Sequence, residues 1–149
     1  MSMAAIPTVT CALIASSKPK REEFSRAEDL YLGGRFVLGR DLARKNDWLI
    51  MVLSAKYGLV SGRTHLYPYD ESLADKTPQE IDAWAKRVEW TLSGIKNAVQ
   101  ITPRRYEFVV LAEDMYALPL RAQGIRAEYP LFGMNEERQK EYLKAALAA

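Results

Sequence analysis

The sequence predicts a single α/β domain over residues 1–149, a three-layer fold with a mostly parallel sheet of about four strands and helices on both faces. Three apolar runs of strand length support this prediction, at residues 9–15, 48–53 and 107–112. Helical patterns separate these runs, and strands that alternate with helices are typical of βαβ units in a parallel sheet. Continuous apolar runs also fit strands that are buried on both faces.

The longest helix is predicted after Thr77-Pro78-Gln79-Glu80, which offers an N-cap threonine, a proline at the first position and a capping-box glutamate. Trp90 lies about half a turn away from Ile81, so we expect it to face another element or a partner. Apolar residues at three- and four-residue steps predict a core-facing stripe of Ile81, Trp84, Ala85, Val88, Leu92, Ile95 and Val99.

The remaining elements are shorter. After Gly33-Gly34, residues 36–45 are predicted to form a helix, and residues 54–76 form a long irregular stretch, which is usually functional or mobile. Residues 117–123 predict a short helix and residues 126–129 a short fourth strand. Asn135 is expected to cap a last helix whose apolar side is Tyr142, Leu143, Ala146 and Leu147.

Composition excludes several classes of site. The net charge of +2 gives no global signature of a nucleic-acid binder, although a local basic patch stays open. Cys11 is the only cysteine and His65 the only histidine, which excludes an intrachain disulfide and multi-histidine metal sites. We expect Cys11 in the core and His65 in an exposed loop. Without a membrane-spanning run or a signal peptide, the expected protein is cytoplasmic and does not bind membranes.

Polar residues follow each of the three strands. In open parallel sheets, ligands bind beyond the carboxyl ends of the strands. If the three strands run parallel, their polar ends fall on one edge of the sheet: Ser17, Lys18 and Lys20 after the first, Ser54, Lys56 and Tyr57 after the second, and Glu113, Asp114 and Tyr116 after the third.

The first and second of these sets suit phosphate. Ser17, Lys18 and Lys20 offer a hydroxyl and two ammonium groups in a loop, although the same run also fits a plain solvated basic loop. The loop has neither a Walker A nor a G-x-G-x-x-G pattern. Lys56, two residues after Ser54, can hold a phosphate or act as a base or nucleophile, or simply pack its stem and keep its ammonium in water.

Carboxylates and tyrosines complete the candidate site. Asp70 is a candidate general base or a partner for a lysine, and is also a routine turn residue. Glu113 is a second candidate for acid–base or nucleophilic chemistry, or an ordinary surface carboxylate. Four tyrosines are candidates for stacking on a nucleobase, or for half-buried core positions: Tyr31, Tyr57, Tyr69 and Tyr116.

These residues resemble a signature spread over nearly the whole chain. Its blocks, in order, are Leu13-Ile14-Ala15-Ser16-Ser17-Lys18-Pro19-Lys20, Asp29-Leu30-Tyr31, Leu53-Ser54-Ala55-Lys56-Tyr57-Gly58-Leu59, Pro68-Tyr69-Asp70 and Pro130-Leu131-x-Gly133. In these blocks, the sequence resembles a largely uncharacterised bacterial and phage domain family.

The resemblance implies an α/β fold and, more loosely, a relationship with nucleic-acid and nucleotide modification enzymes and with YaaA-like stress proteins. Three positions depart from that family's pattern. Ser16 stands where the family usually has Cys, Tyr57 where it often has His, and Glu113 where it tends to have Gly. If the family's Cys is a nucleophile, this chain does not use it.

The leading hypothesis is a small enzyme that acts on a phosphorylated nucleoside or a nucleic-acid base, by cleavage or transfer of a glycosidic bond. Lys18, Lys20 and Lys56 would hold phosphate, the tyrosines would hold the base, and Asp70 or Glu113 would supply acid–base chemistry. This chemistry needs a carboxylate, and we expect no metal and no cofactor.

Two alternatives stay open. The first is a non-catalytic DNA- or RNA-binding domain that uses the Lys18–Arg21 loop together with Arg104-Arg105, with DNA favoured over RNA as the partner. The second is a protein-interaction module in which Trp90 and the last helix form a homodimer face.

Overall fold

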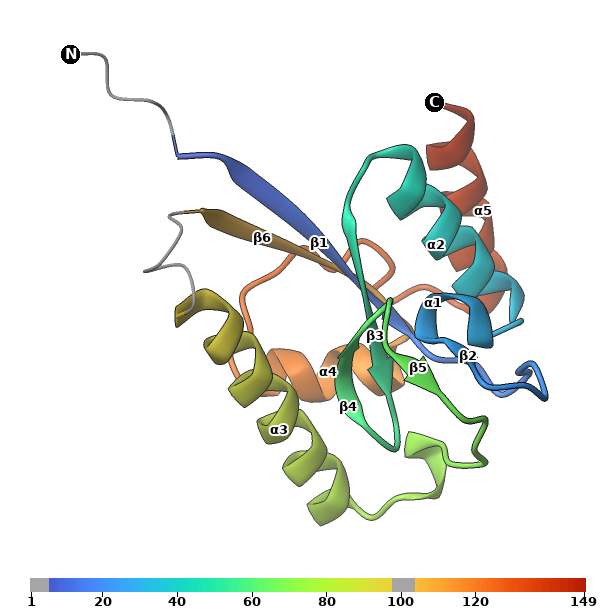
Figure 1. The fold of residues 1–149 in the computed structure, drawn as a ribbon, viewed down its shortest axis with the longest axis vertical. Coiled ribbons are helices and arrows are strands. Elements are labelled where there is room, and N and C mark those ends of the chain that lie inside the picture. The colour runs from blue at the N-terminus through green and yellow to red at the C-terminus, as the bar shows by residue number, and fades with distance from the viewer. Residues whose placement is uncertain (1–5, 98–103) are drawn as a thin grey trace.

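A mostly parallel sheet of four strands forms the centre of the computed structural model, which describes residues 6–97 and 104–149 (Figure 1). The strand order is β4-β3-β1-β6. β1 (Thr8–Ala15) pairs in parallel with both β3 (Leu49–Ser54) and β6 (Arg105–Leu111), whereas β4 (Gly58–Ser61) runs antiparallel to β3. The predicted α/β class and the mostly parallel sheet are therefore confirmed.

The fourth strand was predicted in the wrong place. β4 lies inside the stretch 54–76 that the sequence indicates as irregular, and residues 126–129 contribute only one isolated bridge, between Val109 and Glu128. A tight turn returns the chain from β3 to β4, and Gly58 adopts the positive φ of 73° that this turn needs. The apolar part of β4 is only two residues long, which is too short for a periodicity to identify.

Two further strands form a separate ladder. β2 (Ser25–Arg26) pairs antiparallel with β5 (His65–Leu66), and β5 again falls in the stretch predicted as irregular. His65 is exposed as expected, but it lies in this short strand and not in a loop.

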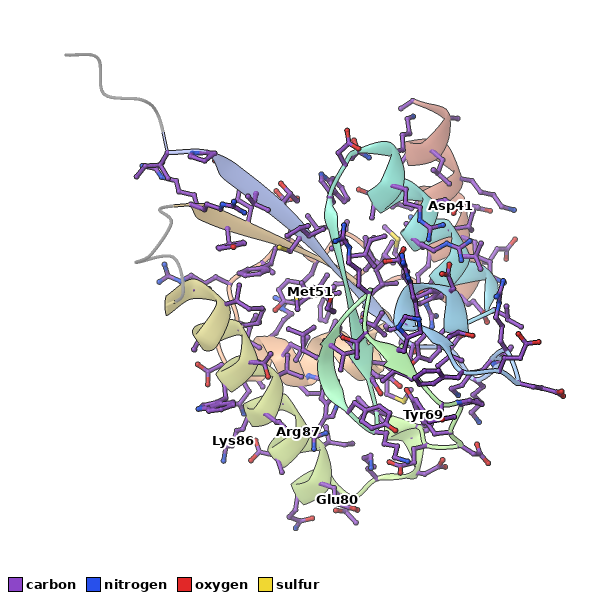
Figure 2. The ribbon with its side chains drawn as sticks, viewed as in Figure 1. Asp41, Met51, Tyr69, Glu80, Lys86 and Arg87 are labelled. Carbon is purple, nitrogen blue, oxygen red and sulfur yellow. The ribbon has the colours of Figure 1, made fainter. Side chains whose placement is uncertain are left out.

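The helices follow the predicted order. Hydrogen bonds between Thr77 and Glu80 form the capping box, at 3.0 Å from the Thr77 N–H to the Glu80 carboxylate and 3.2 Å from the Glu80 N–H to the Thr77 hydroxyl (Figure 2 labels Glu80). The α-helices are α1 (Ala27–Leu30), α2 (Gly34–Lys45), α3 (Pro78–Asn97), α4 (Asp114–Ala122) and α5 (Glu136–Ala148), and a 3₁₀ turn, η1, spans Leu73–Asp75.

Side chains of β1 alternate between two apolar clusters, because successive residues of a strand point to opposite faces. Cys11, Leu13 and Ala15 pack with residues of α3 and α4, whereas Ala12 and Ile14 pack with residues of α2 and α5. Burial raises the pKa of the Cys11 thiol to about 11, consistent with its predicted core position.

The stripe predicted for α3 is largely confirmed. Trp84, Ala85, Val88 and Leu92 are buried, whereas Ile81 and Ile95 are half-buried. Val99 lies outside the described residues.

Two aromatic side chains on the helices face outward. Trp90 on α3 is 78% exposed, so most of its side chain is open to solvent in the described structure. Tyr142 on α5 is also exposed, which corrects one member of the predicted apolar side; Leu143 is buried, and Ala146 and Leu147 pack against the core as predicted. In the described part of the chain, no helix has the length and apolar character needed to cross a membrane.

Gly33 provides a test of the packing between β1 and α2. A Cβ at Gly33 would lie 2.6 Å from the Ser17 Cβ, so Gly33→Ala should force this loop apart and lower the free energy of unfolding by about 1–3 kcal/mol. Gly94→Ala is the matched control, because a Cβ at this α3 position meets nothing within 4 Å. It should stabilise the domain by about 0.5–1 kcal/mol. Urea unfolding of both variants measures the difference, and equal effects would contradict the argument.

Candidate functional site

The polar ends of three parallel strands meet at one edge of the sheet. Ala15 pairs with Leu53, so Ser16 and Ser54 follow side by side. Ile14 pairs with Leu111, which places Ala112 beside Ala15 and brings the third strand end to the same edge. The Ser16 N–H donates to the Leu53 carbonyl over 3.0 Å, which continues the ladder past the end of β1. The predicted convergence of the three strand ends is confirmed as geometry.

Five hydroxyl groups gather at this edge, and we call them the hydroxyl cluster: Ser16, Ser54, Tyr31, Tyr69 and Tyr116. The Tyr69 hydroxyl lies 2.6 Å from the Ser54 Oγ and 2.6 Å from the Tyr31 hydroxyl. The Ser16 Oγ lies 3.4 Å from the Tyr116 hydroxyl. Figure 2 shows Tyr69 near the end of β3, where it connects the loop after β5 to the sheet edge.

Burial keeps the phenols of this cluster protonated. It is the main cause that raises the pKa of Tyr31, Tyr69 and Tyr116 above the ordinary value for tyrosine. Hydrogen bonds from Ser54 and Ser16 oppose the effect of burial at Tyr69 and Tyr116 without reversing it. The three phenols are therefore neutral groups near pH 7, able to donate as well as accept a hydrogen bond.

Only part of the predicted aromatic platform is accessible. The Tyr31 ring is fully buried and packs on Phe36 with ring centroids 5.0 Å apart, and the Tyr116 ring packs edge-on to Trp84 at 5.6 Å. These two rings have no open face for a nucleobase, which corrects that expectation. Tyr57 is 38% exposed and meets Tyr69 edge-on, with the ring centroids 5.5 Å apart.

Helix α3 holds the turn that carries Lys56 and Tyr57. The Trp84 Nε1 donates to the Ser54 carbonyl over 2.8 Å, and the Arg87 Nη2 donates to the Lys56 carbonyl over 3.0 Å (Figure 2 labels Arg87). The Ser54 Oγ also accepts from the Tyr57 N–H at 3.1 Å. Backbone and side chain together therefore fix the strand end.

Two lysines lie over the tyrosine rings. The Lys20 Nζ is 4.7 Å from the centre of the Tyr69 ring, and the Lys56 Nζ is 5.3 Å from that of Tyr57. Partial burial lowers the pKa of Lys20, against the opposing charge of Asp70. Asp70 itself is exposed and does not line the cavity described next, although its neighbour Glu71 does, together with Glu113.

A cavity of about 370 Å³ opens beside the hydroxyl cluster. Its wall is formed by the loop after β1, the first turn of α2, the start of α4 and the loop before η1. Charged and hydroxyl side chains line it together with apolar ones; those that matter for chemistry are Ser16, Ser17, Lys18, Arg35, Glu113 and Tyr116. Glu71 and Glu136 also face it, and Glu136 pairs with Lys140 on α5 over 3.4 Å.

The first turn of α2 reaches the cavity without a side-chain cap. Gly33 is the N-cap residue, and its own N–H donates to the Ser17 Oγ over 3.0 Å. The first helical hydrogen bond runs from the Val37 N–H to the Gly33 carbonyl, so the N–H groups before Val37 have no partner within the helix. A helix start of this kind favours a negatively charged ligand.

Arg35 holds the carboxylate of the cavity in place. Its Nη2 lies 3.1 Å from the Glu113 Oε1 and its Nη1 donates to the Gln139 Oε1 over 3.0 Å. Gln139 is buried and donates in turn to the Met134 carbonyl over 2.7 Å. The Arg35 Nε is buried and has no hydrogen-bond partner among the described residues.

Sequence reasoning missed both Arg35 and Gln139. Gly33-Gly34 is readily taken as a helix breaker, although the arginine that follows it at the start of an uncapped helix is a usable signal. Gln139 has no comparable signal, because 104 residues separate it from Arg35 in the chain.

The basic segments of the nucleic-acid alternative do not form one surface. The Lys18–Arg21 loop follows the carboxyl end of β1, whereas Arg105 begins β6 and pairs with Thr8 at the opposite end of the same sheet. Eight residues of β1 span about 26 Å. That distance separates the two segments, which corrects their combination into one patch.

The hydroxyl cluster predicts a loss of stability in alkaline solution. Because the folded-state pKa of Tyr31 is raised above its unfolded value, the contribution of this group is full below about pH 10 and is lost as the pH rises further. Urea unfolding at several pH values should show a free energy of unfolding that falls above about pH 10, less steeply in Tyr31→Phe. The exposed Tyr67→Phe is the control and should keep the wild-type slope; equal slopes in all three proteins would contradict the prediction.

The hydrogen bonds of Tyr69 predict a second effect. Tyr69→Phe leaves the Ser54 Oγ and the Tyr31 hydroxyl without this partner, and should lower the free energy of unfolding by about 1–3 kcal/mol at neutral pH. Urea unfolding measures it, and a change no larger than that of Tyr67→Phe would show that the network contributes nothing.

Comparison with known proteins places the chain in a family but gives it no activity. Neither curated proteins nor solved structures show a match. A family model described as a family of unknown function (DUF6884) matches residues 11–145, a range that includes every residue lining the cavity. The expectation of an uncharacterised family is thus confirmed, whereas the link to YaaA-like proteins stays a prediction. The chain belongs to this family of unknown function.

Proposed function

We propose that the cavity binds a phosphorylated nucleoside and that the protein cleaves or transfers its glycosidic bond. One observation carries this proposal: a single cavity contains an uncapped helix start with Lys18 and Arg35 beside it, and a carboxylate, Glu113, that Arg35 orients. The helix start and the two cations suit a phosphate, and the carboxylate suits the chemistry at a sugar.

The phosphate would lie at the start of α2. The N–H groups of the first helical turn and the helix dipole favour an anion there. Lys18, which also lines the cavity, adds an ammonium group, and the Arg35 guanidinium adds a second positive charge. Ser17 is already engaged with Gly33 and Pro19, so its role is to shape the loop.

The sugar would lie toward the carboxylates. Acidic side chains accept hydrogen bonds from ribose hydroxyls in other nucleotide sites, which gives Glu71 and Glu136 a role at the rim of an otherwise cationic site. The base would extend toward Tyr57 and Tyr69, whose rings lie under Lys56 and Lys20.

Glu113 is our candidate for the reacting carboxylate. In the transfer reaction its oxygen would attack C1′ while the bond from C1′ to the base breaks, and water or an acceptor would then release the sugar. In direct hydrolysis it would take a proton from the attacking water. The neutral phenol of Tyr116, on the same wall, is a proton donor for the departing base. Asp70, beside Lys20, is the alternative carboxylate.

Binding is tested by a thermal-shift screen over nucleotides, nucleosides and bases, because a ligand that binds only the folded form raises the melting temperature. Lys18→Ala should weaken nucleotide binding about tenfold, as expected for one lost charge-assisted contact. The control is Lys144→Ala, an exposed lysine on α5 that should leave binding unchanged. A screen in which no nucleotide raises the melting temperature would overturn the proposal.

Turnover is tested by chromatography of the released base. Glu113→Gln keeps an oxygen that accepts from Arg35, so it should still bind the nucleotide while base release falls at least about 100-fold. Glu137→Gln, an exposed carboxylate on α5 outside the cavity, is the control. Unchanged release in Glu113→Gln, with loss in Asp70→Asn, would move the chemistry to Asp70.

A further inference from the structure

Three aromatic side chains lie together on the outer side of the β2–β5 ladder, and we call them the aromatic face: Phe24, His65 and Tyr67. The Phe24 ring centroid is 4.4 Å from that of Tyr67 and 5.2 Å from that of His65. Phe24 is 51% exposed and Tyr67 68% exposed, so each ring keeps much of its surface in water. Neither the cavity nor the hydroxyl cluster includes these residues.

The strand alternation of the small ladder creates this face. Ser25 pairs with Leu66, and both point inward and are buried. Residues on either side of an inward position point outward in a strand, which places Phe24 and Arg26 of one segment beside His65 and Tyr67 of the other. The outward direction of the rings therefore follows from the strand alternation of the ladder.

Cationic side chains are frequent on the two segments that carry the aromatic face. The segments 18–26 and 63–67 carry five cationic side chains and two carboxylates, Glu22 and Glu23. Among the described residues, none of the five forms an ion pair: Lys18, Lys20, Arg21, Arg26 and Arg63. By contrast, the three arginines of α2 all form ion pairs: Arg35, Arg40 and Arg44.

We propose that the aromatic face and its cations bind single-stranded nucleic acid. Bases stack on exposed aromatic rings whatever their sequence, and lysine and arginine side chains hold the phosphates between them. A duplex keeps its bases inside the stack and offers these rings nothing to stack on. This surface differs from the one that the sequence predicts, which combines the Lys18–Arg21 loop with Arg104-Arg105.

The aromatic face leads directly to the cavity. Lys20 precedes Phe24 by four residues, and Tyr69 follows Tyr67 by two. The Lys20 Nζ lies 4.7 Å from the centre of the Tyr69 ring, at the hydroxyl cluster. Pro19 and Lys18, the next residues along the loop, line the cavity. A strand on the aromatic face can therefore place one nucleotide in the cavity, so that the substrate is a nucleotide within a strand; this last step rests on the proposed function.

Fluorescence anisotropy with labelled oligothymidylate and oligouridylate of about 12 nucleotides tests the surface, since single-strand sites cover about 4–16 nucleotides. Phe24→Ala and Tyr67→Ala should each weaken binding about tenfold, as expected for one lost base stack. Trp90→Ala, an exposed aromatic on α3, is the matched control and should bind as the wild type. Arg26→Gln and Arg63→Gln should each make the salt dependence shallower by about one unit of slope.

Duplex DNA of the same sequence and vesicles with anionic phospholipids complete the test. The duplex should bind at least about tenfold more weakly than the single strand, and equally in all aromatic variants. The proposal would be overturned if neither oligonucleotide binds at low salt, if Phe24→Ala and Tyr67→Ala bind as tightly as the wild type, or if only the vesicles bind.

The nucleotide screen separates this proposal from the proposed function. If mononucleotides raise the melting temperature but oligonucleotides do not bind, the aromatic face is wrong and the cavity stands. If oligonucleotides bind through Phe24 and Tyr67 while no nucleotide protects the protein, the aromatic face stands and the cavity assignment is wrong.

Discussion

The parallel pairing of β1 with both β3 and β6 is the constraint on which the site depends. Because β1 lies between the other two strands, its carboxyl end at Ser16 is flanked by Ser54 and by the start of the β6–α4 loop. β4 then returns antiparallel to β3, which keeps the turn with Lys56 and Tyr57 at the same edge. Ser16, Ser54, Lys56 and Glu113 are thus brought to one edge because each lies at or just after the end of a parallel strand.

The edge combines two environments with different electrostatic character. The hydroxyl cluster is buried, and removal of water favours the neutral form of its phenols, so it is a network of uncharged donors and acceptors. The cavity beside it contains charges, but Glu113 is compensated by Arg35, whose guanidinium is in turn oriented by Gln139 on α5. The edge thus places a network of neutral hydroxyl groups next to a compensated ion pair.

Local charge matters more here than the net charge of +2. Ion pairs neutralise the arginines of α2, whereas the cations around the β2–β5 ladder have no carboxylate partner in the described residues. The ladder has two residue pairs, and its outward aromatic rings lie on the same segments as those cations. The nearly equal numbers of basic and acidic residues therefore hide an uneven distribution of charge over the surface.

The sequence by itself determined the α/β class, the three parallel strands and the helix that begins at Pro78, because apolar runs and caps act through nearby residues. It also indicated that Ser54, Lys56 and Glu113 follow strand ends, which is enough to locate an edge. Membership of an uncharacterised family could likewise be expected from the sequence alone.

Only the tertiary structure decided which of these groups act together. Glu113 lines the cavity whereas Asp70 does not, Tyr31 and Tyr116 are buried, and Arg35 contacts a glutamine 104 residues away. The β2–β5 ladder and β4 were missed for the same reason, since strands of two to four residues exist only through their partners. Contacts between distant segments carry no local pattern, so the arrangement of the site follows from folding and not from any stretch of sequence.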